Sequence, residues 1–215
     1  GQLRAEPIAP QDRAAVHAMV VQHEGEASAE WVDFWIDRQP AGSTVVRDPS
    51  GVVVGFMQGV SLESAAPHDR DADPATRTAW RYLETRAPLR GSETALCFRT
   101  WLARDTYQSV SAVQSLLFVL AVRLYLITSH LAFHFFACAT PADWAPLFAY
   151  ADLERLVDAD FEIERRSFGA FGHDWRLRPP SAWLGLLAER ETSPTVEVAA
   201  SRPISTPVVV LSADE

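Results

Sequence analysis

One short run between two apolar segments carries the residue types best suited to bind a charged ligand. It reads Leu102-Ala103-Arg104-Asp105-Thr106-Tyr107-Gln108-Ser109-Val110-Ser111-Ala112-Val113 and joins an expected strand to an expected helix. Successive backbone N–H groups at the start of a helix form a concave site for an anion, and the helix dipole favours negative charge there. The run is therefore either an anion-binding turn or a plain capped helix start.

Histidines and acids elsewhere are poorly placed for chemistry. His130 and His134 are four residues apart, but the second lies in an expected strand, where this spacing separates them by about 13 Å. His68 stands in a solvated acidic loop, and His173-Asp174 could orient a ligand or close a hairpin. No Ser/His/Asp order with a nucleophile turn stands out. We expect no metal site.

Hydrophobic periodicity predicts the elements that hold the run. The expected strands are 5–10, 43–47, 52–62, 94–103, 131–139 and 161–171, and the expected helices are 13–23, 29–38, 75–85, 111–129, 142–156 and 182–191. The segment 64–74 is polar and acidic, which predicts a surface loop, and Gly169 and Gly172 are expected in turns. The helix 111–129 is apolar on most sides, so it should be nearly buried.

This order of elements resembles the GNAT acyltransferase superfamily over roughly residues 3–175. The resemblance implies an α/β (α+β) fold, with a mixed central sheet flanked by helices. Two central strands then splay apart, and the pantetheine of an acyl-CoA pairs with the open edge. The family's loop reads Arg/Gln-x-x-Gly-x-Gly/Ala, and Tyr107 and Gln108 fit their places in it. The residues implied to contact acetyl-CoA or another acyl-CoA are Leu102, Arg104, Gln108, Ser109, Val110, Ser111, Ala112 and Val113.

The loop departs from the family pattern at three positions. Ser111 and Val113 stand where the family has small residues, chiefly glycine, and Val110 stands where it has lysine or arginine. Glycine lets the backbone approach a phosphate and adopt positive φ at little cost, and a β-branched side chain does neither. The sequence therefore predicts weakened binding of the pyrophosphate.

The family's catalytic acid and base are also altered. Phe148 occupies the place of the tyrosine that protonates the departing thiolate, and Asp152 replaces the following glycine. Tyr150 lies two residues on, about 200° round a helix. The interior of strand 94–103 has no carboxylate, so Glu93 at its beginning and Asp105 beyond its end are the nearest. Tyr150 and Glu93 are the remaining candidates for catalysis.

Three functions follow from the resemblance. The first is an acetyltransferase-like domain with weakened or lost acyl-CoA catalysis and a sensing or interaction role in a larger protein. The alternative is an active N-acyltransferase with an atypical site, acting on a small-molecule or peptide amine held near Trp80 and Tyr82. The third, a structural or oligomerising domain without a ligand, rests instead on the aromatic residues of the surface helices. Whether the chain is an enzyme stays open.

Composition narrows the class of partner. The net charge is −9, and all nineteen basic residues are arginine, which indicates a GC-rich, bacterial-like coding bias. An acidic chain without clustered positive charge is not expected to bind nucleic acid. We expect a cytoplasmic protein without a membrane segment, because no apolar run reaches about 18 residues and no signal peptide is visible. Residues 1–191 form the expected domain; the Ser-, Thr- and Pro-rich segment 192–215 is linker-like, which indicates a fragment of a longer, multidomain chain.

Overall fold

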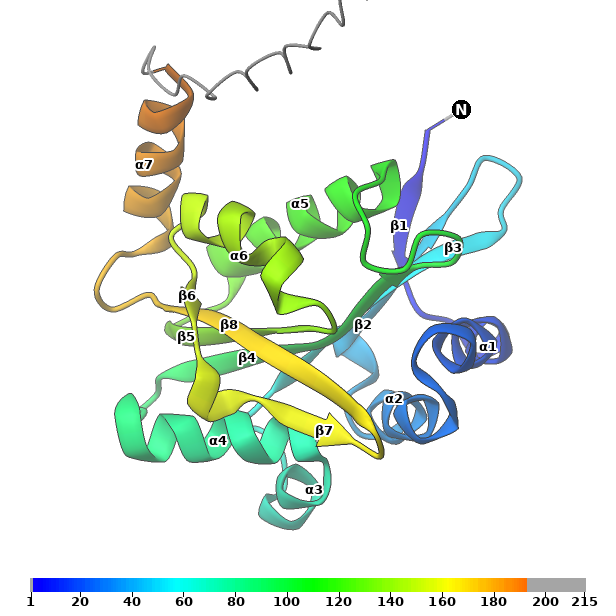
Figure 1. The fold of residues 1–215 in the computed structure, drawn as a ribbon, viewed down its shortest axis with the longest axis horizontal. Helices are drawn as coiled ribbons and strands as arrows, with labels where there is room; N and C mark the ends of the chain where they lie inside the picture. Colours follow the sequence, from blue (N-terminus) through cyan, green and yellow to red (C-terminus); the bar gives the residue numbers. More distant parts are fainter. Residues whose placement is uncertain (1, 193–215) are drawn as a thin grey trace, which may run out of the picture.

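An eight-stranded mixed sheet organises residues 2–192, which are the residues described by this computed structural model (Figure 1). The strands are β1 (Arg4–Pro7), β2 (Ser43–Arg47), β3 (Val53–Ser61), β4 (Thr94–Ala103), β5 (Leu131–Cys138), β6 (Glu154–Arg155), β7 (Phe161–Ile163) and β8 (Arg166–Asp174). Their spatial order is β1-β2-β3-β4-β5-β8-β6, and β7 pairs with β8. The central β4–β5 pair is parallel and the other pairs are antiparallel.

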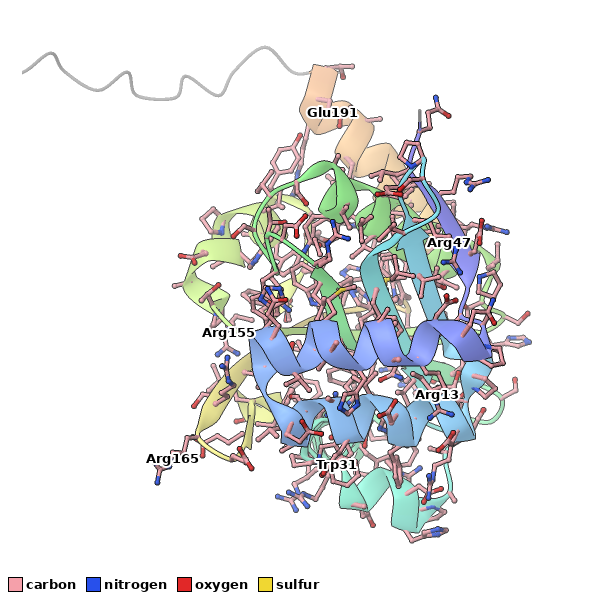
Figure 2. All side chains as sticks on the ribbon, turned by 90° about the vertical axis from the view of Figure 1, so that its right-hand side faces the viewer. Arg13, Trp31, Arg47, Arg155, Arg165 and Glu191 are labelled. Carbon is pink, nitrogen blue, oxygen red and sulfur yellow. The ribbon has the colours of Figure 1, made fainter. Side chains whose placement is uncertain are left out.

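Helices cover both faces of the sheet. The helices are α1 (Arg13–Glu24), α2 (Glu26–Arg38), α3 (Pro67–Ala72), α4 (Pro74–Arg86), α5 (Ala112–Ile127), α6 (Pro141–Tyr150) and α7 (Pro180–Thr192). In Figure 1, α5 and α6 lie above the sheet, while α1 to α4 lie below it. Figure 2 shows α1 and α2 side by side, with Arg13 at the α1 start beside α2. No described helix is long and apolar enough to cross a membrane.

Aromatic side chains build the core on both faces. On the α5/α6 face the buried set includes Phe98, Trp101, Leu117, Phe136 and Trp144. On the opposite face it includes Trp35, Leu83, Phe133, Phe135 and Ala170. Because β4 and β5 contribute to both sets, these two strands are covered on both sides, as their continuous apolar sequences predict.

Local capping fixes the two helices that begin next to β4. Asp73 precedes Pro74, and its carboxylate accepts a hydrogen bond of 3.1 Å from the amide of Ala75, so α4 starts there. Ser111 caps α5 in the same way, because its hydroxyl oxygen accepts from the amide of Gln114 at 3.2 Å. The serine cap therefore fixes where α5 begins after β4.

The predicted α+β fold and its order of elements are confirmed, with differences of detail. The segment 64–74 is not a loop throughout, because it contains α3, whose Arg70 is buried and stacks on Trp80 with its guanidinium carbon 3.5 Å from the ring centroid. The single strand expected at 161–171 is a hairpin of β7 and β8, and Glu164 at its tip has a φ of 54°. The helix α3 was not predicted because its segment is acidic, and the turn between β7 and β8 was not predicted because charged residues occupy it.

Two burial and turn predictions are wrong. Gly169 and Gly172 lie inside β8, where a side chain on Gly172 would meet the carbonyl oxygen of His134, so close packing explains that glycine. The helix α5 has an exposed apolar face, with Val119 63%, Leu126 52% and Ile127 60% exposed. Only its other face contacts the sheet. The proposed linker 192–215 lies, apart from Thr192, outside the described residues.

Candidate functional site

The candidate site is a gap between the two parallel central strands. Pairing between β4 and β5 runs from Thr94 and Leu131 to Phe98 and Phe136, although both strands continue beyond that point. On the other edge of β4, Thr100 pairs with Gln58 and Phe98 with Gly59, so Arg99 is an extra residue. Such a bulge bends the strand and increases its twist. The bulge therefore coincides with the separation of β4 from β5, and the expected splay is present.

The side chain of Gln108 crosses this gap. Its amide nitrogen donates to the carbonyl oxygens of Trp101 on β4, at 3.3 Å, and Ala137 on β5, at 3.4 Å. Its amide oxygen accepts from the backbone N–H of Ala139 at 3.0 Å. Gln108 is only 4% exposed, so one carboxamide satisfies backbone groups that the separated strands would otherwise leave unpaired.

Trp101 closes the gap from the α5/α6 side. Its indole N–H donates to the carbonyl oxygen of Ala137 at 2.6 Å, and the side chain is fully buried. The ring packs edge-on against Phe136 and Trp144, with centroids 5.8 and 5.2 Å away. Two side chains of this chain therefore occupy the space between the strands.

The loop that carries Gln108 is held in an unusual backbone conformation at Tyr107. This residue has a φ of 53°, which is uncommon outside glycine and indicates a constrained site. Its phenol donates to a carboxylate oxygen of Glu24 at 2.8 Å, and its ring stacks on His23 with centroids 5.0 Å apart. The side-chain amide of Gln114 donates to its carbonyl oxygen. These contacts fix the position of the neighbouring Gln108.

Glu24 is a buried acid next to the gap that sequence reasoning did not identify. It lies at the end of α1 and is 5% exposed. Burial raises its pKa, and the hydrogen bond from Tyr107 and the charge of Arg99 partly oppose that rise. Burial, followed by the charge of Glu24, also raises the pKa of Tyr107. A carboxyl with a raised pKa beside a strand gap is a group that can hold or release a proton.

A buried ion pair forms the floor of the gap on the face of α1 to α4. The guanidinium of Arg99, the bulge residue, donates to Asp73 at 2.6 Å, and the two side chains are 1% and 0% exposed. Asp73 also accepts from the indole N–H of Trp35 at 2.7 Å. The bulge is thus tied to α2 and to the cap of α4. Arg99, the charged residue inside an apolar strand, was the sequence signal for this pair.

The start of α5 retains free donors but has the wrong surroundings for a polyanion. Within the described part of the chain, the amides of Val110 to Val113 make no hydrogen bond. Of these residues, Val110 lines a cavity of about 530 Å³ between this loop and α6, and Asp143 is the only charged residue among its described lining. Val110 is 84% exposed, and Val113 packs over Gly55 of β3. A carboxylate without a compensating cation disfavours a diphosphate at this mouth.

The residues present therefore do not fit an acyl-CoA in this arrangement. A pantetheine arm needs the space and the backbone groups that Gln108 and Trp101 use, and its diphosphate would face Asp143. Of the implied contacts, Leu102 is buried and pairs with Phe56, and the carbonyl of Arg104 accepts from His23 at 2.7 Å. Ser109 lies on the loop and lines the cavity, and Ala112 is the first residue of α5.

The residues considered for catalysis are not brought to the gap. Tyr150 is 41% exposed at the end of α6 beside Arg190, and Phe148 is buried among aromatic side chains. Glu93 precedes β4 at its opposite end and bonds to Arg176 at 3.2 Å. The titratable groups described beside the gap are instead Glu24 and Tyr107, together with the ion pair of Arg99 and Asp73.

The two residues suggested for a substrate cleft lie apart from the gap as well. Trp80 donates to Glu84 on its own helix at 2.8 Å and lies under Arg70. Tyr82 packs on Phe133 and lines a polar cavity of about 430 Å³ with His173. Both belong to α4, as predicted, but they face different surroundings.

Comparison with known proteins shows which solved structures share this architecture. No family model matches the sequence, and no curated protein matches it either. Solved structures do match: the NatC complex bound to Gag peptide and CoA (11% identity, 81% of this chain and 99% of that chain, TM-score 0.53) and the loading GNATL domain of CurA from Lyngbya majuscula (12%, 83% and 100%, 0.50). Arabidopsis thaliana NAA60 with a bisubstrate analogue is similar (13%, 80% and 95%, 0.50). The chain therefore has the fold of these GNAT structures.

Proposed function

We propose that this GNAT-fold domain has lost efficient acyl transfer and acts as a sensing or interaction module within a larger protein. The observation that carries the proposal is the carboxamide of Gln108, which spans the strand gap and bonds to both strands. An incoming ligand must first break these hydrogen bonds. At about 0.5–1.5 kcal/mol each, they oppose binding by roughly 1.5–4.5 kcal/mol.

Two further features support the proposal. The first concerns the loss of catalysis, and the second concerns an interaction role. Phe148 replaces a proton donor with an apolar ring, so a thiolate would leave without an acid at that position. The exposed apolar face of α5, with Val119, Leu126 and Ile127, is the kind of surface that a neighbouring domain can cover.

The alternative is an active acyl-CoA-dependent N-acyltransferase whose gap opens when Gln108 rotates away. It is favoured by one specific observation, the buried pair of Glu24 and Tyr107 beside the gap. A carboxyl with a raised pKa is suited to take the proton of an attacking amine. The solved neighbours that were crystallised with CoA or a bisubstrate analogue show that the fold accommodates such ligands in those proteins.

Binding of acetyl-CoA, measured by calorimetry, tests the closed gap directly. We expect no measurable heat for the wild-type chain at millimolar ligand and measurable binding for Gln108→Ala, because the variant removes competing hydrogen bonds worth about tenfold or more in affinity. Gln22→Ala on α1, an exposed glutamine whose side chain makes no hydrogen bond with the described residues, is the matched control and should behave as wild type. Micromolar binding by the wild type would contradict the proposal.

Thiol release from acetyl-CoA separates the two functions. We expect no release that depends on an added amine, tested with spermidine and with a lysine-containing peptide. If amine-dependent release occurs and Glu24→Gln abolishes it while Gln22→Ala does not, the alternative function is correct.

A further inference from the structure

A buried histidine on the central strand β5 has no hydrogen-bond partner. His134 is 0% exposed, and neither of its ring nitrogens bonds to a residue that the structure describes. Its ring packs against Tyr125 of α5, Phe98 of β4 and Trp175, with centroids 4.5, 6.1 and 5.4 Å away. Burying a charge without a counter-ion costs far more than burying a neutral polar group, so this aromatic surrounding favours the neutral imidazole.

The titratable groups around this ring also oppose its protonation. Tyr125 faces it from α5, and burial raises the pKa of that phenol, so it stays uncharged. His173 faces it from β8, because the two histidines are direct cross-strand partners. Burial, and next the charge of His173, lower the pKa of His134. A proton on His134 would therefore meet another histidine and no bonded carboxylate among the described residues.

His173 itself is placed to carry a positive charge. Its Nδ1 lies 2.8 Å from the carbonyl oxygen of Asp152, and its Nε2 lies 3.2 Å from the carbonyl oxygen of Arg178. A neutral imidazole donates only one hydrogen bond, so both contacts are satisfied only when the ring carries two protons. The carboxylate of Asp152 is also 3.9 Å from Nδ1. Acid can thus charge His173 in place, whereas it cannot charge the buried ring beside it.

The segment 175–192, which contains α7, covers the ring of His134. Trp175 contacts that ring and packs on Trp183 of α7, with the two indole centroids 5.5 Å apart. Among the described residues of α7 only Trp183 is buried, and its indole N–H donates to the carbonyl oxygen of Ala151 at 2.6 Å. Figure 1 shows α7 (orange) at the side of the domain, with its far end away from the sheet. A segment with few buried contacts opens more readily than the core.

We propose that the segment 175–192 is an acid-released strap, which covers His134 at neutral pH and detaches when this histidine takes up a proton. Detachment gives water to the ring of His134 and to the indole N–H of Trp175, both of which lack a partner in the closed state. Protonation of His173 acts in the opposite sense, because its imidazolium donates to the carbonyl of Arg178 within the strap. His134 lies where β4 and β5 are still paired, so the strap does not depend on the strand gap or on acyl-CoA.

Proton linkage gives the size of the expected effect. An exposed histidine has a pKa of about 6.5, and burial lowers the pKa of His134 in the closed state. The contribution of His134 to closure is therefore full above about pH 6.5 and is lost as the pH falls below that value. Through this one group, the ratio of open to closed molecules should rise about tenfold from pH 7.5 to pH 5.5.

Hydrogen exchange of the full chain at pH 7.5 and pH 5.5 tests the proposal. Protection factors, which correct for the intrinsic pH dependence of exchange, report the opening of each segment. For the slowest amides of α7, the ratio of protection in wild type to protection in His134→Phe should fall about tenfold between the two pH values. Phenylalanine keeps an aromatic ring in the cluster and cannot take up a proton. The amides of α7 should also be less protected than those of β4 and β5 at both pH values.

A matched variant and a second measurement complete the test. His68→Phe makes the same substitution at a histidine whose side chain is 83% exposed, and the ratio of wild type to this variant should not change with pH. Histidine ring signals in NMR spectra of the wild type need no variant. They should show a neutral His134 at pH 5.5 in molecules whose α7 is still protected.

Three results would overturn the proposal. In the first, the ratio for His134→Phe stays constant, which means that α7 opens without exposing the histidine. In the second, α7 and the strands β4 and β5 have equal protection at both pH values, which means that the domain opens only as a whole. In the third, His134 is protonated at pH 5.5 while α7 keeps its protection.

Discussion

Removing the charge of Asp73 tests whether the buried ion pair holds the floor of the strand gap. We expect Asp73→Asn to destabilise the domain by about 3–5 kcal/mol, because the guanidinium of Arg99 would remain buried without its counter-ion. The indole of Trp35 and the amide of Ala75 donate to different oxygens of Asp73, so asparagine keeps an acceptor for only one of them and the expected loss includes one of these hydrogen bonds as well as the charge. The expected loss is a large part of a typical stability of about 5–15 kcal/mol.

An exposed pair in the same chain provides the matched control. Arg13 and Asp37 also approach to 2.6 Å, but their side chains are 38% and 58% exposed. Asp37→Asn should cost only about 0.2–1 kcal/mol, because water screens the pair and solvates the remaining charge. The comparison holds the distance constant and varies burial.

Urea unfolding monitored by tryptophan fluorescence and circular dichroism gives the free energies of unfolding. The double variant Asp73→Asn with Arg99→Met should regain most of the stability lost by the single variant, because no unpaired charge is left. The reasoning is refuted if Asp73→Asn costs no more than Asp37→Asn, or if the double variant is no more stable than Asp73→Asn.

Three further outcomes are expected. The hydrogen bond to Asp33 raises the pKa of His17, so this contribution to stability is full below about pH 6.5 and is lost as the pH rises through the folded pKa; the difference in urea midpoint between wild type and His17→Gln should shrink from pH 6 to pH 9. Burial raises the pKa of Cys97 to about 12, so Ellman's reagent should not modify it at pH 8 until urea unfolds the chain. Gly55→Ala should cost about 1–3 kcal/mol, because the new methyl meets Val113, and adding Val113→Ala should restore stability; equal stability of Gly55→Ala and wild type would contradict the packing.

Most of the fold was predictable because periodicity reports burial. The strand 94–103 is largely apolar on both faces and has clear breaks on either side, and it was predicted with the bounds that the structure gives. The helix in segment 64–74 was not predicted, because the acidic residues of this segment suggest a solvated loop. The helix α3 forms there because Arg70 buries its guanidinium against Trp80, a tertiary contact that composition does not report.

The site was predictable only in its place along the chain. The loop at Tyr107 and Gln108 lies beside the gap, and the side chain of Gln108 turns inward next to the positive φ of Tyr107, which the sequence does not indicate. Glu24 lies 83 residues before Tyr107, so their hydrogen bond could not be inferred without coordinates. The spacing of residues along the chain therefore located the loop, whereas contacts between residues distant in sequence determine which side chain occupies the gap.

The contacts of Tyr107 couple the loop that carries Gln108 to the end of α1. Gln108 follows Tyr107 directly, and the ring and hydroxyl of Tyr107 are attached to His23 and Glu24 at the last turn of α1. A molecule that displaces the side chain of Gln108 from between β4 and β5 must strain or break these contacts. Displacement of Gln108 would therefore also disturb the last turn of α1, which lies outside the sheet.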